Sequence, residues 1–247
     1  MKLLIIRHAD PDYEIDGLTA AGHQEAKLLS AWFLKQKNER GFRIDAAYQS
    51  PLGRARATAA YTLDALGITA ETCPWLREFD AKVRRPDKEE PTIAWDWLPG
   101  DLCAEPAFFD ASSWMTPEPF AASDVREKYL AVCEGLDALL LRHGYKRDGR
   151  FYRAVSPNHD CIALFCHFGV ECVILSHLLN CSPMPLWHGF CGLPSSITTL
   201  FTEERRQGIA SFRVTEFGAL PHLAAAGEGP SFSARFCECW TDDTRHD

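Results

Sequence analysis

The sequence has no long apolar run, no excess of basic residues and no Cys-x-x-Cys pair. No stretch approaches the roughly 20 apolar residues that a membrane-spanning helix needs. The apolar run near the start, Leu3 to Ile6, closes at Arg7 and is too short for the core of a signal peptide. We therefore expect a cytoplasmic protein that has no membrane partner.

Basic residues are outnumbered, because 26 Lys and Arg stand against 34 Asp and Glu and give a formal net charge of −8 over 247 residues. A nucleic-acid partner favours a positively charged protein surface, so this balance argues against one. The balance does not argue against a single phosphate group, since the field inside a cleft depends on nearby charges and not on the total.

The ten cysteines lack the paired spacing that is typical of zinc sites. Thiols stay reduced in the cytoplasm, so we expect most of these side chains to be small buried hydrophobic groups. Cys237 and Cys239, near an acidic tail, keep a metal site in the tail open as an alternative. The prediction is that the protein binds no metal and no other cofactor.

Apolar runs alternate with helical patterns along most of the chain, which predicts an α/β fold. Leu3 to Ile6 and residues 162–165 are continuous apolar runs of the kind found in strands buried on both faces. Further strands are expected at residues 44–49, 69–72, 151–155, 196–201 and 211–217, and helices at residues 19–41, 50–67, 123–143 and 170–179. The expected fold class is a three-layer sandwich with a mostly parallel sheet, helices on both faces and an inserted cap.

Residues 80–123 differ in composition from the rest of the chain, since they hold six prolines together with three tryptophans and several phenylalanines. Prolines break long elements, while the aromatic side chains argue against a flexible linker. We expect a single domain over residues 1–247, with residues 80–123 as an ordered cap over the sheet and residues 236–247 as a peripheral tail.

Two arginines and two histidines fall where strands end or helices begin. Arg7 and His8 end the first strand, His167 ends the strand that begins near Cys161, and Arg54 lies in the first turns of a helix. Ligands of open α/β sheets bind beyond the carboxyl ends of the strands. We therefore expect these side chains to meet there and to make a positive spot on an otherwise negative surface.

These residue types are suited to phosphate chemistry. The guanidinium fork of arginine matches phosphate oxygens, and a neutral imidazole can attack phosphorus and form a covalent intermediate. Positive neighbours stabilise the charge on the phosphoryl oxygens during transfer. A carboxyl group of raised pKa could protonate the leaving oxygen and afterwards activate water.

Five segments carry a resemblance when they are taken in order along the chain. They are Leu4-Ile5-Ile6-Arg7-His8-Ala9, Leu18-Thr19-Ala20-Ala21-Gly22-His23-Gln24-Glu25-Ala26, Ser50-Pro51-Leu52-Gly53-Arg54-Ala55-Arg56-Ala57-Thr58-Ala59, Leu76-Arg77-Glu78-Phe79 and Phe165-Cys166-His167-Phe168-Gly169-Val170. Together they resemble the histidine phosphatase superfamily, also called phosphoglycerate mutase-like, in its branch 1 type.

The resemblance implies a role for each matching residue. His8 would be the nucleophile that becomes phosphohistidine. Arg7, Arg54 and His167 would hold the phosphoryl group, and His167 would share in catalysis. Glu78 would be the general acid and then the general base. The family needs no metal, so none is expected in this chain.

Two of these assignments have rivals close by in the sequence. Arg56 lies two residues beyond Arg54 and would point to another side of the helix. Asp80 and Glu71 lie near Glu78 and offer the same carboxyl chemistry. The register of the resembling segments favours Arg54 and Glu78.

The chain departs from the family pattern at two places. Ala9 replaces the signature glycine, which restricts the backbone if a positive φ is needed there. The mutases continue with Ser and then Trp-Asn, where this chain has Pro11, Tyr13 and Glu14. We therefore predict a phosphatase that hydrolyses a small phosphorylated metabolite through a phosphohistidine. The alternatives are phosphoglycerate mutase-type transfer and an inactive module that binds a phosphate ligand.

Specificity is expected to come from the cap. Its aromatic side chains could shape an apolar or ring-bearing pocket, although packing within the cap is the commoner role for such residues. The side chains in question are Trp95, Trp97, Phe108, Phe109 and Trp114.

Overall fold

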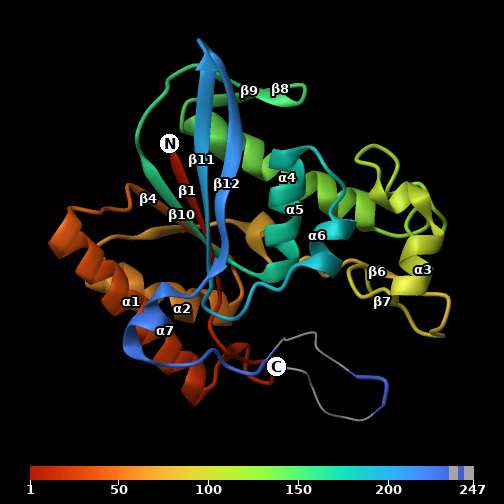
Figure 1. Cartoon of the computed structure of the whole chain (residues 1–247), viewed down its shortest axis with the longest axis horizontal. Coiled ribbons are helices and arrows are strands. Elements are labelled where there is room, and N and C mark those ends of the chain that lie inside the picture. Colours follow the sequence, from red (N-terminus) through yellow and green to blue (C-terminus); the bar gives the residue numbers. More distant parts are fainter. Residues whose placement is uncertain (234–238, 242–247) are drawn as a thin grey trace.

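The structure is a computed structural model that describes residues 1–233 and 239–241. Eight strands form one sheet in the order β5-β4-β10-β1-β11-β12-β9-β8 (Figure 1). The strands are β1 (Lys2–Arg7), β4 (Ala46–Gln49), β5 (Ala70–Thr72), β8 (Tyr145–Asp148), β9 (Phe151–Ala154), β10 (Cys161–Cys166), β11 (Ile197–Arg206) and β12 (Ile209–Ala219). Two short pairs lie outside this sheet, β2 (Pro11–Asp12) with β3 (Gly17–Leu18) and β6 (Lys82–Val83) with β7 (Thr92–Ile93).

Helices cover both faces of the sheet, so the α/β class is confirmed. The helices are α1 (Ala20–Arg40), α2 (Gly53–Leu66), α3 (Pro99–Ala104), α4 (Val125–Arg142), α5 (Phe168–Leu179), α6 (Met184–Gly189) and α7 (Pro221–Ala226), with the 3-10 turns η1 (Pro74–Leu76) and η2 (Pro106–Phe109). None of the helices within the described residues is long and apolar enough to cross a membrane.

The sheet is mixed, whereas the sequence predicts a mostly parallel one. Strands β5, β4, β10 and β1 are parallel, and β11, β12, β9 and β8 are antiparallel. Strands β11 and β12 form one long hairpin, which forces them to be antiparallel. The outer half of β11, residues 201–206, is mostly polar and exposed, whereas Ala210 and Phe212 at the facing end of β12 are buried. Residues 202–206 resemble a loop in the sequence, but they continue β11 as part of a ribbon (Figure 1).

Strand β1 shows why the central strands are apolar throughout. Leu3 and Ile5 belong to the hydrophobic cluster that includes α4 and α5, whereas Leu4 and Ile6 belong to the cluster that includes α1 and α2. Successive side chains of a strand point to opposite faces, so a strand with helices on both sides is apolar at every position.

The predicted helix ends are mostly confirmed. Thr19 caps α1 by accepting a hydrogen bond from the backbone N–H of Gly22 at 3.0 Å, and Gly41 ends the helix at φ +65°. The helix expected from residue 50 begins instead at Gly53, because the Ser50 hydroxyl accepts from the backbone N–H of Leu52 at 3.2 Å and holds the chain in a bend.

Residues 80–123 contain β6, β7, α3 and η2, and they lie beside α5 and α6 rather than over the sheet (Figure 1). The backbone N–H of Trp97 donates to Nε2 of His188 at the end of α6, and the Ser182 hydroxyl donates to the Phe108 carbonyl. Most of the segment's aromatic rings pack on one another, with neighbouring centroids 4.9–5.9 Å apart. The rings in this cluster are Trp97, Phe108, Trp114 and Phe120, all buried.

Most of the predicted peripheral tail, residues 236–247, lies outside the described residues, as does Cys237 of the alternative metal site. Of the described cysteines, five are buried as expected for small hydrophobic groups: Cys73, Cys133, Cys161, Cys166 and Cys172.

Packing in the aromatic cluster predicts that two adjacent phenylalanines contribute very differently to the free energy of unfolding. Phe108 is 1% exposed and Phe109 is 46% exposed. We expect Phe108→Ala to lower the free energy of unfolding by about 3–5 kcal/mol through lost burial and a cavity. Phe109→Ala is the matched control and should change it by less than about 0.5 kcal/mol. Urea denaturation measures both, and equal losses would contradict the packing described.

Candidate functional site

The parallel pairing of β1 with β10 brings the two predicted histidines together. Arg7 of β1 is in register with Cys166 of β10, so the next residue of each strand leaves the sheet at the same edge. The backbone N–H of His8 donates to the Cys166 carbonyl at 3.0 Å. As a result, the His8 and His167 rings lie with their centroids 5.0 Å apart.

His8 is held as a neutral imidazole with a defined tautomer. Its side chain is buried, and its Nδ1 lies 2.8 Å from the Ala9 carbonyl oxygen. A carbonyl oxygen can only accept, so Nδ1 carries the proton and Nε2 keeps its lone pair. Burial, reinforced by the charges of Arg7 and Arg54, holds the pKa of His8 well below its usual value.

His167 is also neutral and is fixed by Ser50. Its Nε2 lies 2.7 Å from the Ser50 hydroxyl, and its Nδ1 has no hydrogen-bond partner among the described residues. Burial first, and then the neighbouring His8 and arginine side chains, hold the pKa of His167 well below its usual value. The Nδ1 edge of the ring is therefore available to a ligand.

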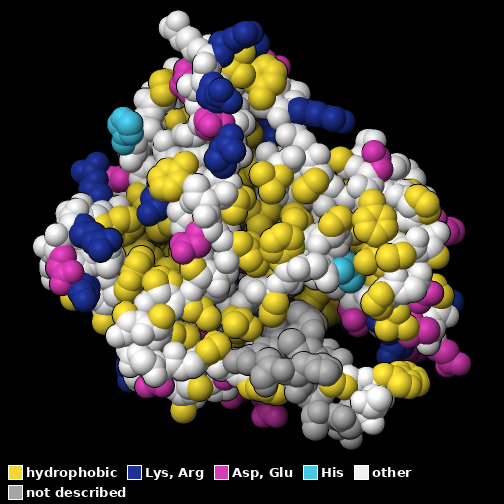
Figure 2. All heavy atoms as spheres, viewed as in Figure 1, with side chains coloured by type: hydrophobic (Ala, Val, Ile, Leu, Met, Phe, Trp, Pro, Cys, Tyr) yellow, Lys and Arg dark blue, Asp and Glu magenta, His cyan; other side chains and the backbone are white. Residues whose placement is uncertain are grey.

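Arg7 and Arg54 lie at the same edge of the sheet, but they are buried, with 4% and 9% exposure. The expected positive spot is therefore an internal one. On the face drawn in Figure 2, Lys and Arg side chains gather instead around the far end of the β11–β12 hairpin and at the left edge. Arg7 donates through Nη1 to the Gly192 carbonyl, and its guanidinium lies 5.7 Å from the centroid of the Phe168 ring.

Arg54 is oriented by Asp16, which the sequence analysis did not identify. The Asp16 carboxylate accepts from Arg54 Nη1 at 2.7 Å and from the backbone N–H of Gly53 at 2.6 Å. The close approach requires glycine at position 53, because a Cβ there would lie 2.1 Å from the Asp16 carbonyl oxygen. Asp16 has φ +48° in the β2–β3 turn. No pattern in the sequence indicated this contact, since its partners are distant along the chain.

The chain just after His8 is fixed by two of the resembling segments. The Ala9 N–H donates to the Thr58 hydroxyl at 2.9 Å, and that hydroxyl donates to the Arg54 carbonyl at 2.8 Å. Thr19 donates to the Asp10 carboxylate at 2.6 Å. Ala9 has no positive φ, so alanine in place of the signature glycine introduces no backbone strain.

The Glu78 side chain lies against the N-terminus of α5, the helix that is capped by His167. Its Oε1 accepts from the backbone N–H of Phe79 at 2.8 Å and from that of Val170 at 3.1 Å. A Cβ on Gly169 would lie 2.5 Å from this oxygen, so the helix can approach only with glycine there. Burial raises the pKa of Glu78, and the two hydrogen bonds and Arg7 only partly oppose the rise.

The sequence neighbours that rivalled these residues lie elsewhere. Asp80 pairs with Lys128 at 2.6 Å, and Glu71 pairs with Arg142 at 2.9 Å. Arg56 is exposed on α2. The structure thus brings together the five side chains that the resemblance indicates: Arg7, His8, Arg54, Glu78 and His167.

A second carboxyl group, Glu171, was missed by the sequence analysis. It lies in the first turn of α5 and is 1% exposed. Burial raises its pKa to about 7, a rise that the charge of Arg7 opposes and that of Glu78 reinforces. The signal was present, because Glu171 is the only acidic residue in a mostly apolar helix, Phe168–Leu179.

The five side chains form one cluster, which we call the cradle, and its groups have the chemistry to hold one tetrahedral anion. Two guanidinium groups and the His167 Nδ1 edge supply hydrogen-bond donors or positive charge, and His8 Nε2 supplies a lone pair. Within residues 1–233 and 239–241, no three His, Cys, Asp or Glu side chains are grouped so that they could hold a metal ion.

Comparison with known proteins places this geometry in a family context. Residues 3–98 match the family described as Histidine phosphatase superfamily (branch 1). No curated protein has a significantly similar sequence.

Three solved structures illustrate the shared fold. Phosphoserine phosphatase from Entamoeba histolytica, a variant in complex with phosphoserine, is 19% identical, with 90% of this chain and 98% of that chain covered and a TM-score of 0.55. Mycobacterial glucosyl-3-phosphoglycerate phosphatase is 18% identical, with 88% and 98% covered and a TM-score of 0.56. Alpha-ribazole phosphatase from Shigella flexneri is 20% identical, with 89% and 97% covered and a TM-score of 0.50. At these identities the likeness shows the fold.

The electrostatics of the site can be tested with two neighbouring arginines. Arg54→Gln removes a positive charge from the cluster, so we expect the pKa values of His8 and His167 to rise. Arg56→Gln, an exposed position on the same helix, is the control and should leave both unchanged. Titration of the imidazole nitrogens by NMR measures the shifts. Equal responses to the two substitutions would show that Arg54 does not act on the histidines.

Proposed function

We propose that the chain is a phosphomonoesterase, since its residues 3–98 match the histidine phosphatase superfamily (branch 1). The substrate would be a small phosphorylated metabolite, hydrolysed through a phosphohistidine on His8. The observation that carries the proposal is the buried, neutral His8 with its Nε2 lone pair free, beside Arg7, Arg54 and His167. Two structures of one relative, the Entamoeba histolytica phosphoserine phosphatase, have phosphoserine or 3-phosphoglyceric acid bound, which supports a substrate of this size.

In the first step, His8 Nε2 would attack phosphorus while the ester P–O bond breaks. Arg7 and Arg54 would balance the negative charge on the phosphoryl oxygens. If the Ser50 hydroxyl donates to His167 Nε2, then His167 carries its proton on Nδ1 and can donate it to a phosphoryl oxygen. Glu78 would give its proton to the leaving alcohol oxygen.

In the second step, the Glu78 carboxylate would take a proton from water as the water oxygen attacks phosphorus. The P–N bond then breaks, inorganic phosphate leaves, and both His8 and Glu78 return to their first state. The raised pKa of Glu78 suits this exchange of roles, since the group must give a proton in one step and accept one in the next.

The nucleophile can be tested with a pair of histidine variants. His8→Ala should abolish turnover of p-nitrophenyl phosphate, because no other group in the cradle can form the phosphoenzyme. His23→Ala, at an exposed histidine of α1, should keep full activity. Rapid quenching of the wild-type enzyme should trap acid-labile phosphate on His8. Retained activity in His8→Ala would refute the mechanism.

Assays of the wild-type enzyme also distinguish a phosphatase from a mutase and from an inactive binding module. Incubation of the wild-type enzyme with a phosphoglycerate should release inorganic phosphate. Formation of the isomeric phosphoglycerate without phosphate release would establish mutase chemistry instead. Binding of phosphate with no turnover of any ester would establish the inactive module.

The role of Glu78 as the general acid can be tested by varying the leaving group of the ester and the pH. Glu78→Gln should lower kcat by about 100-fold or more for ethyl phosphate, whose leaving oxygen needs a proton, and much less for p-nitrophenyl phosphate. Wild-type activity on ethyl phosphate should fall as the pH rises through the raised pKa of Glu78, since the acid form is then lost. On the acid side of the pH profile, activity should fall only at a pH below the ordinary range of histidine pKa values, because the pKa of His8 is lowered.

Asp80→Asn is the matched control, because Asp80 is a neighbouring carboxyl that pairs with Lys128. It should leave the dependence on the leaving group and the alkaline limb unchanged. If Asp80→Asn instead removes that limb and Glu78→Gln does not, the acid has been assigned to the wrong residue.

A further inference from the structure

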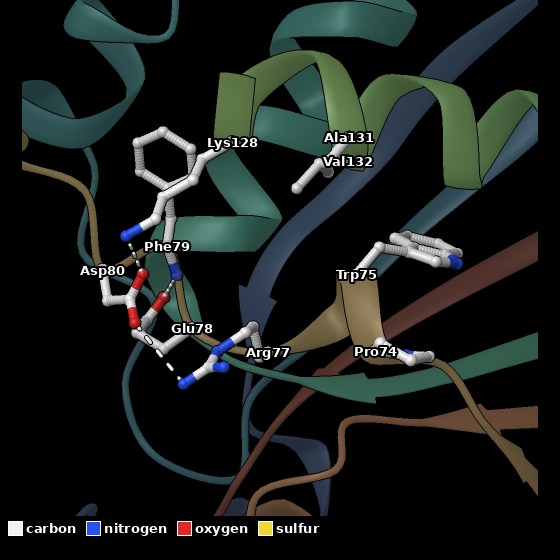
Figure 3. A pocket seen from close by; sticks show the side chains of 9 residues that line it. All are labelled: Pro74, Trp75, Arg77, Glu78, Phe79, Asp80, Lys128, Ala131 and Val132. Carbon is white, nitrogen blue, oxygen red and sulfur yellow. Dashed lines mark hydrogen bonds and ion pairs between the residues drawn. The ribbon is translucent and has the colours of Figure 1, made fainter. Parts of the chain in front are cut away.

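A pocket of about 510 Å³ lies between η1 and α4, directly beside Glu78 (Figure 3). We refer to it as the η1–α4 pocket. Its walls come from Trp75 on one side, Ala131 and Val132 on α4, and Glu78, with Arg77 and Lys128 at its rim. We propose that the η1–α4 pocket binds the alcohol half of the substrate and selects phosphate esters of aromatic or other flat apolar alcohols. This inference rests on the proposed phosphatase function.

The position of the pocket follows from the chemistry of the leaving group. The leaving oxygen must lie within hydrogen-bond reach of the carboxyl group that protonates it, so the rest of the alcohol begins next to Glu78. Glu78 lines the η1–α4 pocket, and so does the adjacent Arg77. Glu78 also accepts from the backbone N–H of Val170 at the start of α5, next to His167. The cradle and the pocket therefore meet at Glu78.

The walls of the pocket favour a flat apolar group. The Trp75 ring lies directly on the backbone of α4, because a Cβ on Gly135 would come within 2.4 Å of it. Packing therefore fixes the indole, and Ala131 and Val132 supply aliphatic surface across from it (Figure 3). The volume is in the range of small-molecule sites, which are mostly apolar with a few polar groups.

The charges at the rim argue against a second anionic group on the substrate. Lys128 is paired with Asp80 at 2.6 Å and with Asp124 at 2.8 Å, and Arg77 is paired with Asp80 at 3.4 Å. A carboxylate or a second phosphate in the pocket would lie next to Asp80 and compete with it for these cations. An uncharged ring leaves the three ion pairs in place.

Most aromatic side chains of residues 80–123 pack within their own segment. Trp97, Phe108 and Trp114 of residues 80–123 are buried in their own cluster, and Trp95 donates from Nε1 to the Phe79 carbonyl at 2.8 Å. The segment expected to confer specificity thus supports the loop that carries Glu78, while the surface next to the acid comes from η1 and α4.

Filling the pocket tests the proposal. Ala131 is exposed on α4, so Ala131→Phe adds a ring inside the pocket without disturbing the core. We expect it to lower kcat/KM for 1-naphthyl phosphate by about 10-fold or more. It should leave kcat/KM for ethyl phosphate, and inhibition by inorganic phosphate, within about twofold of the wild type. Ala138→Phe, at an exposed alanine two turns along the same helix, is the control and should change neither ester.

A second comparison uses the wild-type enzyme alone. It should prefer 1-naphthyl phosphate over 3-phosphoglycerate and phosphoserine in kcat/KM, and the preference should shrink in Ala131→Phe. Equal losses for the naphthyl and ethyl esters, or no loss for either, would overturn the pocket while leaving the phosphatase function intact. Absence of turnover of every ester by the wild type would overturn the proposed function itself.

Discussion

The site depends on one constraint, the register in which β1 pairs with β10. Because Arg7 lies opposite Cys166, the chain leaves both strands at the same level and places His8 beside His167. A shift of one residue would also turn Leu3 and Ile5 away from α4 and α5 and exchange the two faces of the strand. The hydrophobic core therefore sets the spacing of the two imidazoles as firmly as any contact within the site.

The second constraint is electrostatic, since two guanidinium groups are buried within one cradle. Like charges in a site of low dielectric constant repel strongly, and two further cations would add to that cost. Burial first, and the arginine charges in addition, keep the imidazoles neutral, and each is held by an uncharged partner, the Ala9 carbonyl or the Ser50 hydroxyl. Asp16 compensates Arg54, and the Gly192 carbonyl accepts from Arg7. The same balance leaves His8 Nε2 with the lone pair that the proposed mechanism uses.

Much of this arrangement could be predicted from the sequence, because it is local. Apolar runs that end in Arg7-His8 and in His167 specify buried strands with polar side chains at their carboxyl ends, and the resembling segments add Arg54 and Glu78. The contacts that could not be predicted join distant parts of the chain. Asp16 reaches Arg54 through the β2–β3 turn, and the outer half of β11 is mostly polar and resembles a loop. The position of residues 80–123 beside α6 likewise depends on packing between segments.

The boundary of the family match suggests how the two halves of the site divide their tasks. Residues 3–98 contain Arg7, His8, Arg54 and Glu78, which on the proposed mechanism meet the phosphoryl group and the oxygen next to it. The walls beyond that oxygen combine η1, inside the match, with α4, outside it. On the proposed function, the phosphoryl chemistry can therefore be kept while α4 changes, since α4 lines the η1–α4 pocket. On this argument, the residues of α4 that face Trp75 determine which alcohol this chain releases.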